Sequence, residues 1–91
     1  MVLTNPLHET AVLIRHDGQT AILVKLRAGK LGCERLPESV LRRQWQESRF
    51  PLAETLDRFL AHAAIHGASQ EALRGLNKLR ARDACVISNL F

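Results

Sequence analysis

The sequence predicts an α+β domain in which an N-terminal antiparallel β-hairpin packs on three α-helices. Two β-like runs, 10–16 and 19–27, flank an Asp17-Gly18 pair that favours a tight turn. Apolar residues then follow helical spacing across a helical part, 37–82. The chain has 91 residues, of which 46% are hydrophobic. That length suits one small core, so we expect a single domain over 1–91.

The N-terminal region is predicted to be a flexible arm, 1–8, followed by the β-hairpin, 9–27. A two-residue turn at Asp17-Gly18 pairs Leu13 with Ile22 and Val12 with Leu23. This register leaves both faces of the hairpin apolar at their centres, whereas helices cover only one. We therefore interpret one face and its rim as a protein interface, used for self-association and formed by Val12, Ile14, Ala21, Leu23, Lys25 and Arg27.

Residues 28–35 are interpreted as a glycine-punctuated loop, and three helices are expected after it. The first two begin near Pro37 and Pro51, and the third is capped by Ser69 after a stop at Gly67. The apolar tail, 84–91, is β-like and is interpreted as a candidate short C-terminal strand. The predicted inward residues of the second and third helices are Leu56, Phe59, Leu60, Leu73 and Leu76.

The charge and cysteine content restrict the partners and the compartment. A formal net charge of +4 permits an anionic partner such as nucleic acid but does not require one. The start resembles no signal peptide, and no apolar run approaches membrane-spanning length. The two cysteines share no C-x-x-C spacing. We therefore expect a cytoplasmic protein with reduced thiols and no membrane partner.

Residues 59–82 contain a helix-turn-helix-like pattern with Gly67 at the turn. The small and apolar positions Ala63, Leu73 and Leu76 fall at the offsets of that motif. In this interpretation Arg74 contacts a base edge and Lys78 contacts a phosphate. The alternative is an ordinary helical hairpin with a solvated basic face. The candidate nucleic-acid-binding residues are Ser69, Gln70, Arg74, Lys78 and Arg82.

The residues that carry catalysis or bind metal form no recognisable motif. His62 and His66 share a helix face, but no further ligands have supporting spacing. Arg35 is placed to lower the pKa of Cys33, but no base is placed beside the thiol. We therefore expect no enzyme activity, no metal site and no cofactor.

Two functions remain. The favoured one is a small non-enzymatic regulatory module that acts by protein–protein interaction, as an inhibitor, adaptor or antitoxin-like protein. It would bind a protein partner and self-associate through the apolar hairpin face. The alternative is a helix-turn-helix-like DNA-binding transcriptional regulator that uses residues 59–82. The two are compatible, because small DNA-binding regulators are usually dimers.

Overall fold

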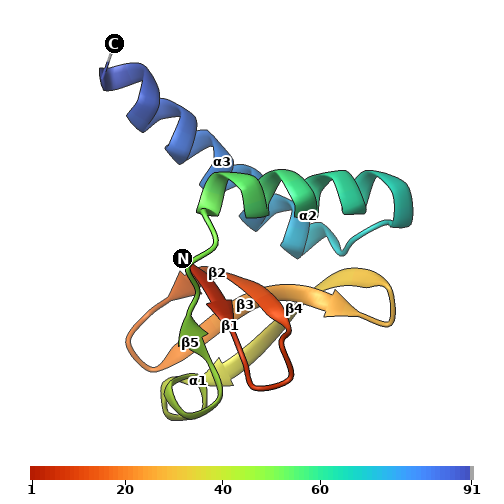
Figure 1. The fold of residues 1–91 in the computed structure, drawn as a ribbon, viewed down its shortest axis with the longest axis vertical. Coiled ribbons are helices and arrows are strands. Elements are labelled where there is room, and N and C mark those ends of the chain that lie inside the picture. Colours follow the sequence, from red (N-terminus) through yellow and green to blue (C-terminus); the bar gives the residue numbers. More distant parts are fainter. Residues whose placement is uncertain (91) are drawn as a thin grey trace.

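The chain forms an α+β fold with an antiparallel sheet of five strands and three helices (Figure 1). This computed structural model describes the backbone of residues 1–90 and the side chains of residues 1–82. The strand order across the sheet is β4-β3-β2-β1-β5. In chain order the elements are β1 (Val2–Thr4), β2 (Thr10–His16), β3 (Thr20–Arg27), β4 (Lys30–Pro37), α1 (Glu38–Gln44), β5 (Gln46–Glu47), α2 (Leu52–His66) and α3 (Gln70–Leu90).

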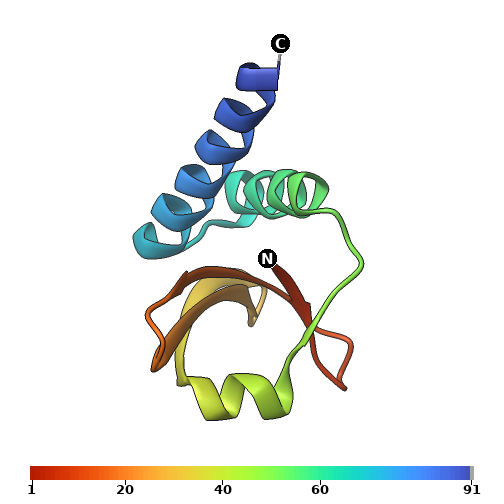
Figure 2. The same ribbon diagram turned by 90° about the vertical axis from the view of Figure 1, so that its left-hand side faces the viewer.

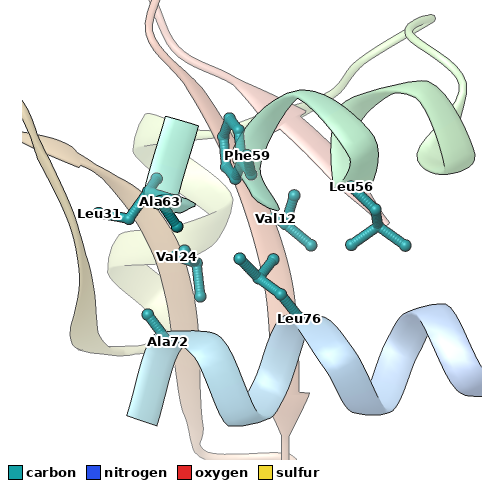
Figure 3. Close-up of a cluster of buried hydrophobic side chains, with 8 residues drawn as sticks. All are labelled: Val12, Val24, Leu31, Leu56, Phe59, Ala63, Ala72 and Leu76. Atoms are coloured by element: carbon teal, nitrogen blue, oxygen red, sulfur yellow. The ribbon is translucent and has the colours of Figure 1, made fainter. Parts of the chain in front are cut away.

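The sheet lies between helices of the same chain. Figure 2 shows α2 and α3 on one side of the curved sheet and α1 on the other. Two buried clusters occupy these two sides. The helix-side cluster, drawn in Figure 3, comprises Val12, Val24, Leu31, Leu56, Phe59, Ala63, Ala72 and Leu76. The Trp45 cluster, on the α1 side, comprises Leu3, Ala11, Leu23, Leu36 and Trp45.

The predicted flexible arm is instead a strand inside the sheet. β1 lies between β2 and β5, and Val2 and Leu3 are each only 4% exposed. The Asn5 side chain organises the turn that follows, because its oxygen accepts hydrogen bonds from the backbone N–H groups of Leu7 and Glu9 at 3.1 and 3.0 Å. A three-residue strand is too short to show alternation, so its sequence carried no strand signal.

The predicted hairpin exists, but its register is different. The tight turn is centred on Gly18-Gln19, one residue later than expected, and Asp17 and Thr20 close it with a backbone hydrogen bond of 3.2 Å. Gly18 has the positive φ that was predicted, at 92°. The ladder then shifts again between Leu13 and Arg15, at a β-bulge.

The corrected register separates residues that were predicted to share a face. Val12 pairs with Val24, and Leu13 pairs with Leu23. Val12 therefore belongs to the helix-side cluster, whereas Leu23 belongs to the Trp45 cluster on the opposite face. Because side chains alternate along a strand, a one-residue error in pairing moves one strand's whole set to the other face.

The predicted loop over 28–35 is mostly strand β4. Ala28 and Gly29 both have positive φ, at 51° and 81°, as a two-residue hairpin turn requires. β4 pairs with β3 from Arg27↔Lys30 to Thr20↔Pro37. The two glycines and the charged residues of this segment suggested a loop. The strand forms because its apolar position Leu31 reaches the helix-side cluster and Leu36 reaches the Trp45 cluster.

The starts and stops of the helices agree with the sequence signals. α1 and α2 begin directly after Pro37 and Pro51. Gly67 ends α2 with φ 87°, and the Ser69 hydroxyl accepts a hydrogen bond from the backbone N–H of Ala72 at 3.2 Å. Of the predicted inward residues, Leu56, Phe59 and Leu76 are buried, whereas Leu60 and Leu73 are only partly buried against the helix-side cluster.

The predicted C-terminal strand is wrong. The backbone of α3 continues as helix through Leu90, and Phe91 lies outside the described residues. Strand propensity depends on a neighbouring strand to pair with. In this fold the segment directly follows residues that are already helical. Extending an existing helix adds one hydrogen bond per residue and avoids the cost of nucleating a new helix.

Candidate nucleic-acid interface

The apolar hairpin residues predicted as a self-association surface are covered by the chain itself. Val12, Ala21 and Leu23 have no exposed surface. Ile14 is half-buried and packs against the helix-side cluster. Both faces of the hairpin are therefore covered at their centres. Helices α2 and α3 cover one side of the sheet, and the Trp45 cluster fills the other, so the reason for predicting an interface there no longer holds.

The two basic residues of that predicted surface have different surroundings. The Lys25 ammonium lies 3.1 Å from a carboxylate oxygen of Glu34 and 5.7 Å from the centre of the Trp45 ring. Its side chain is only 14% exposed, so it has a structural role in covering the Trp45 cluster. Arg27 is exposed at the end of β3.

Residues 59–82 comprise the second part of α2, the turn at Gly67 and the described side chains of α3. An ion pair of 3.3 Å joins Arg80 to Asp57, which lie thirteen residues after Gly67 and ten residues before it. Both ribbon views show α3 running back across α2 (Figures 1 and 2).

α3 approaches β2 closely at Gly75. A Cβ atom added to Gly75 would lie 2.6 Å from Cδ1 of Ile14, so only glycine fits this contact without a shift. Beside this contact the end of β2 and the middle of α3 enclose an open cleft of about 490 Å³. We call it the basic cleft; it is lined by Ile14, Arg15, His16, Gly75, Lys78, Leu79 and Arg82.

Among the side chains that the structure describes, the lining of the basic cleft carries positive charge and no carboxylate. Within residues 1–82, no carboxylate lies within ion-pair distance of Arg15, Lys78 or Arg82. His16 is different, because its Nε2 lies 3.4 Å from a Glu38 oxygen that also accepts hydrogen bonds from Arg42. Cations gathered on the two walls of one cleft create a local positive potential that attracts anions.

The structure brings only part of the predicted nucleic-acid set together. Lys78 and Arg82 line the basic cleft, whereas Arg74 is exposed one helical turn earlier and outside the lining. The Ser69 hydroxyl is used in capping α3, and Gln70 is exposed in the first turn of that helix.

Arg15 and His16 are the cleft residues that the sequence interpretation missed. They belong to a strand more than sixty residues away from Lys78 along the chain, and no local pattern joins them to α3. One feature of the sequence could have pointed to them. The two basic residues directly precede the hairpin turn, where no apolar residue follows that they would shield from water. Their meeting with α3 depends on the bulge in β2 and on the small size of Gly75.

The cysteine that was considered as a nucleophile is not activated by its surroundings. Burial, followed by the charge of Glu71, raises the pKa of the Cys33 thiol above its ordinary value of 9.0. A hydrogen bond with the Ser69 side chain and the charge of Arg35, whose guanidinium also binds the Glu71 carboxylate at 2.9 Å, lower that pKa by less than burial and Glu71 raise it. A thiol with a raised pKa is mostly protonated at neutral pH and is a poor nucleophile.

The two neighbouring histidines of α2 stack on each other, with ring centres 4.5 Å apart. His62 Nε2 also lies 2.8 Å from the carbonyl oxygen of Gly29. In the described part of the chain, no three His, Cys, Asp or Glu side chains gather in a way that could hold a metal ion. Nor does any described helix combine the length and apolar character that a membrane crossing needs.

No protein-family model, no curated protein and no solved structure matches this chain.

Proposed function

We propose that this chain is a non-enzymatic binding module that contacts the phosphate backbone of double-stranded nucleic acid through the basic cleft. The observation that carries the proposal is the meeting of Arg15, from β2, with Lys78 and Arg82, from α3, in one cleft whose described lining holds no acidic residue. Arginine and lysine are the side chains that most often neutralise phosphates.

The geometry favours phosphate contacts over the reading of bases. Consecutive cations at positions 74, 78 and 82 lie about 6 Å apart along the helix axis, so they form one basic stripe. Lys78 and Arg82 line a cleft beside the end of β2, whereas the recognition helix of DNA-reading motifs inserts its side chains into a major groove. The cleft lining includes no Phe, Tyr or Trp on which unpaired bases would stack. These features fit a module that binds double-stranded nucleic acid with little sequence preference.

The test is the salt dependence of binding to a fluorescently labelled random-sequence duplex, measured by anisotropy. Lys78→Gln and Arg15→Gln should each weaken binding and reduce the slope of log affinity against log salt by about one. Arg43→Gln is the matched control, because it removes the same charge from α1, on the other side of the sheet. Equal effects of all three variants, or no binding by the wild type at low salt, would refute the proposal.

Arg74 provides a separate test of base reading. If Arg74 contacted a base edge, Arg74→Ala should relax the preference for one duplex sequence by about 1–3 kcal/mol. The proposed phosphate contact instead predicts that Arg74→Ala changes the affinities for all duplex sequences by the same factor. Selection of binding sequences from a random duplex library, by the wild type and by Arg74→Ala, distinguishes these two outcomes.

A protein partner, which includes a second copy of the chain, is the second candidate. The supporting observation is Ile65, a large apolar side chain that is 77% exposed on α2. A single exposed apolar residue is common on monomers, so this support is weaker. Sedimentation of the wild type and of Ile65→Lys tests self-association: an assembly that the lysine dissociates would favour this candidate.

A further inference from the structure

A second cavity lies between the sheet and α2, and it shares no residue with the basic cleft. Its volume is about 450 Å³, within the range of small-molecule sites. The lining residues come from the turn after β1, the start of β2, the end of β3, the segment before α2, and α2 as far as His62. They are His8, Glu9, Thr10, Leu26, Phe50, Thr55, Arg58, Phe59 and His62.

One part of this cavity is apolar. Phe59 is 8% exposed and belongs to the helix-side cluster, whereas Leu26 and Phe50 are 42% and 56% exposed. Two large apolar side chains thus remain in water beside a buried aromatic ring, although burying either would stabilise the protein. A ligand with an apolar body would remove this surface from water.

The polar groups of the cavity favour an anion. Arg58 and two histidines, His8 and His62, line it together with a single carboxylate, that of Glu9. The Glu9 carboxylate is already engaged, because it accepts a hydrogen bond from the Asn5 side chain at 2.9 Å and lies 4.0 Å from the Lys25 ammonium. No carboxylate within residues 1–82 lies within ion-pair distance of Arg58.

The turn that presents His8 is held in place. His8 has φ 61°, a left-handed backbone conformation that few non-glycine residues adopt. The carbonyl oxygen of Asn5 accepts a hydrogen bond from the His8 N–H at 2.9 Å, and the Asn5 side chain binds the Leu7 and Glu9 N–H groups. His62 is likewise fixed, by its 2.8 Å contact with the Gly29 carbonyl. Such preorganisation lowers the cost of ordering side chains when a ligand binds.

From this combination we infer that the cavity between α2 and the sheet is a binding site for a small organic carboxylate with an aromatic or aliphatic body. The carboxylate pairs with the guanidinium of Arg58, whose planar donor fork matches it. The apolar body lies against Phe50, Phe59 and Leu26. This site is separate from the proposed nucleic-acid contact, since none of the α3 side chains that the structure describes lines it.

The experiment is a titration of the full chain with 2-naphthoate, followed by two-dimensional ¹H–¹⁵N NMR. We expect saturable shifts of backbone signals confined to the turn after β1, the start of β2, the end of β3, and residues 50–62. Arg58→Gln should weaken binding about tenfold, the loss expected for one charge-assisted pair. The uncharged analogue 2-naphthalenemethanol should bind the wild type weakly, with an affinity similar to that of naphthoate for Arg58→Gln.

Two control variants separate this site from general attraction and from the basic cleft. Arg49→Gln removes an equal charge from a residue near Phe50 that does not line the cavity, and it should leave naphthoate binding unchanged. Lys78→Gln, which tests the nucleic-acid proposal, should also have no effect. Shifts that do not saturate, shifts spread over the whole surface, or equal affinities of the wild type and Arg58→Gln would overturn the inference. If only the duplex-binding experiments failed, the inference about this cavity would be unaffected.

Discussion

The two buried clusters are built in different ways from the same sheet. Among the described side chains, the helix-side cluster has eight buried members, and five of them come from α2 and α3. The Trp45 cluster has five, drawn from β1, β2, β3, β4 and the residue after α1. α1 itself contributes no buried residue, and its Val40 and Leu41 are only partly buried against the cluster.

This difference explains why the helix-side cluster could be predicted from the sequence, whereas the Trp45 cluster could not. Helices of fifteen and twenty-one residues repeat their apolar stripe often enough to be recognised. The Trp45 cluster takes one or two residues from each of several short elements, so no window of sequence contains its pattern. The sequence therefore suggests an uncovered hairpin face, whereas Trp45, together with Val40 and Leu41 of α1, packs against it.

The largest expected effect concerns Trp45, the only aromatic residue of its cluster. Trp45→Ala should destabilise the fold by about 3–5 kcal/mol, because α1 has no buried side chain that could fill the space. Urea unfolding measured by circular dichroism gives this value. If the loss were below about 1 kcal/mol, the Trp45 cluster would contribute little and the helix-side cluster alone would hold the fold.

A smaller effect is expected at the contact between α3 and β2. Gly75→Ala should destabilise by about 1 kcal/mol, because the clash with Ile14 exceeds the gain in helix propensity. Urea midpoints of the wild type and the variant measure the change.

The matched background for this test is Ile14→Ala, which removes Cδ1 and Cγ2 and leaves only Cβ, at 3.1 Å, close to the added methyl group. In that background Gly75→Ala should destabilise clearly less than in the wild type, because the gain in helix propensity then opposes a much smaller clash. A double-mutant cycle measures the coupling between the two sites. Additive effects would show that α3 does not depend on the close approach at Gly75.

The smallest expected effect is the acid dependence of the Asp17 turn. Hydrogen bonds from the Thr20 and Gln19 N–H groups lower the pKa of Asp17 from its ordinary value of 3.8. Because the folded state favours the charged form, the stabilisation is complete above that ordinary value and is lost as pH falls through the lower folded pKa. Asp17→Asn keeps an accepting oxygen but does not titrate.

Thermal unfolding of the wild type and Asp17→Asn over a series of pH values tests this expectation. The difference in stability should be greatest at neutral pH and should shrink towards zero in acid. A difference that is constant with pH would mean that the turn at Gly18-Gln19 does not depend on the charge of Asp17.

The candidate site was predictable only on its helical side. The stripe of Arg74, Lys78 and Arg82 follows from spacing alone, since positions four residues apart share a helix face. The opposite wall, Arg15 and His16, could not be assigned, because its position depends on a bulge and on a turn centred one residue later than expected. The cavity lined by His8 and Arg58 was missed for a related reason: the turn that holds His8 was interpreted as a flexible arm.

By itself the sequence determined the elements whose signals are local. The strands on either side of Gly18, the positive φ of that glycine, the proline starts of α1 and α2, and the end of α2 at Gly67 all follow from single residues or short patterns. Only the tertiary structure decided the register of β2 on β3, the inclusion of β1 in the sheet and the helical C-terminal end of α3. Turn chemistry and capping act over a few residues, whereas strand pairing and burial depend on which distant surfaces meet.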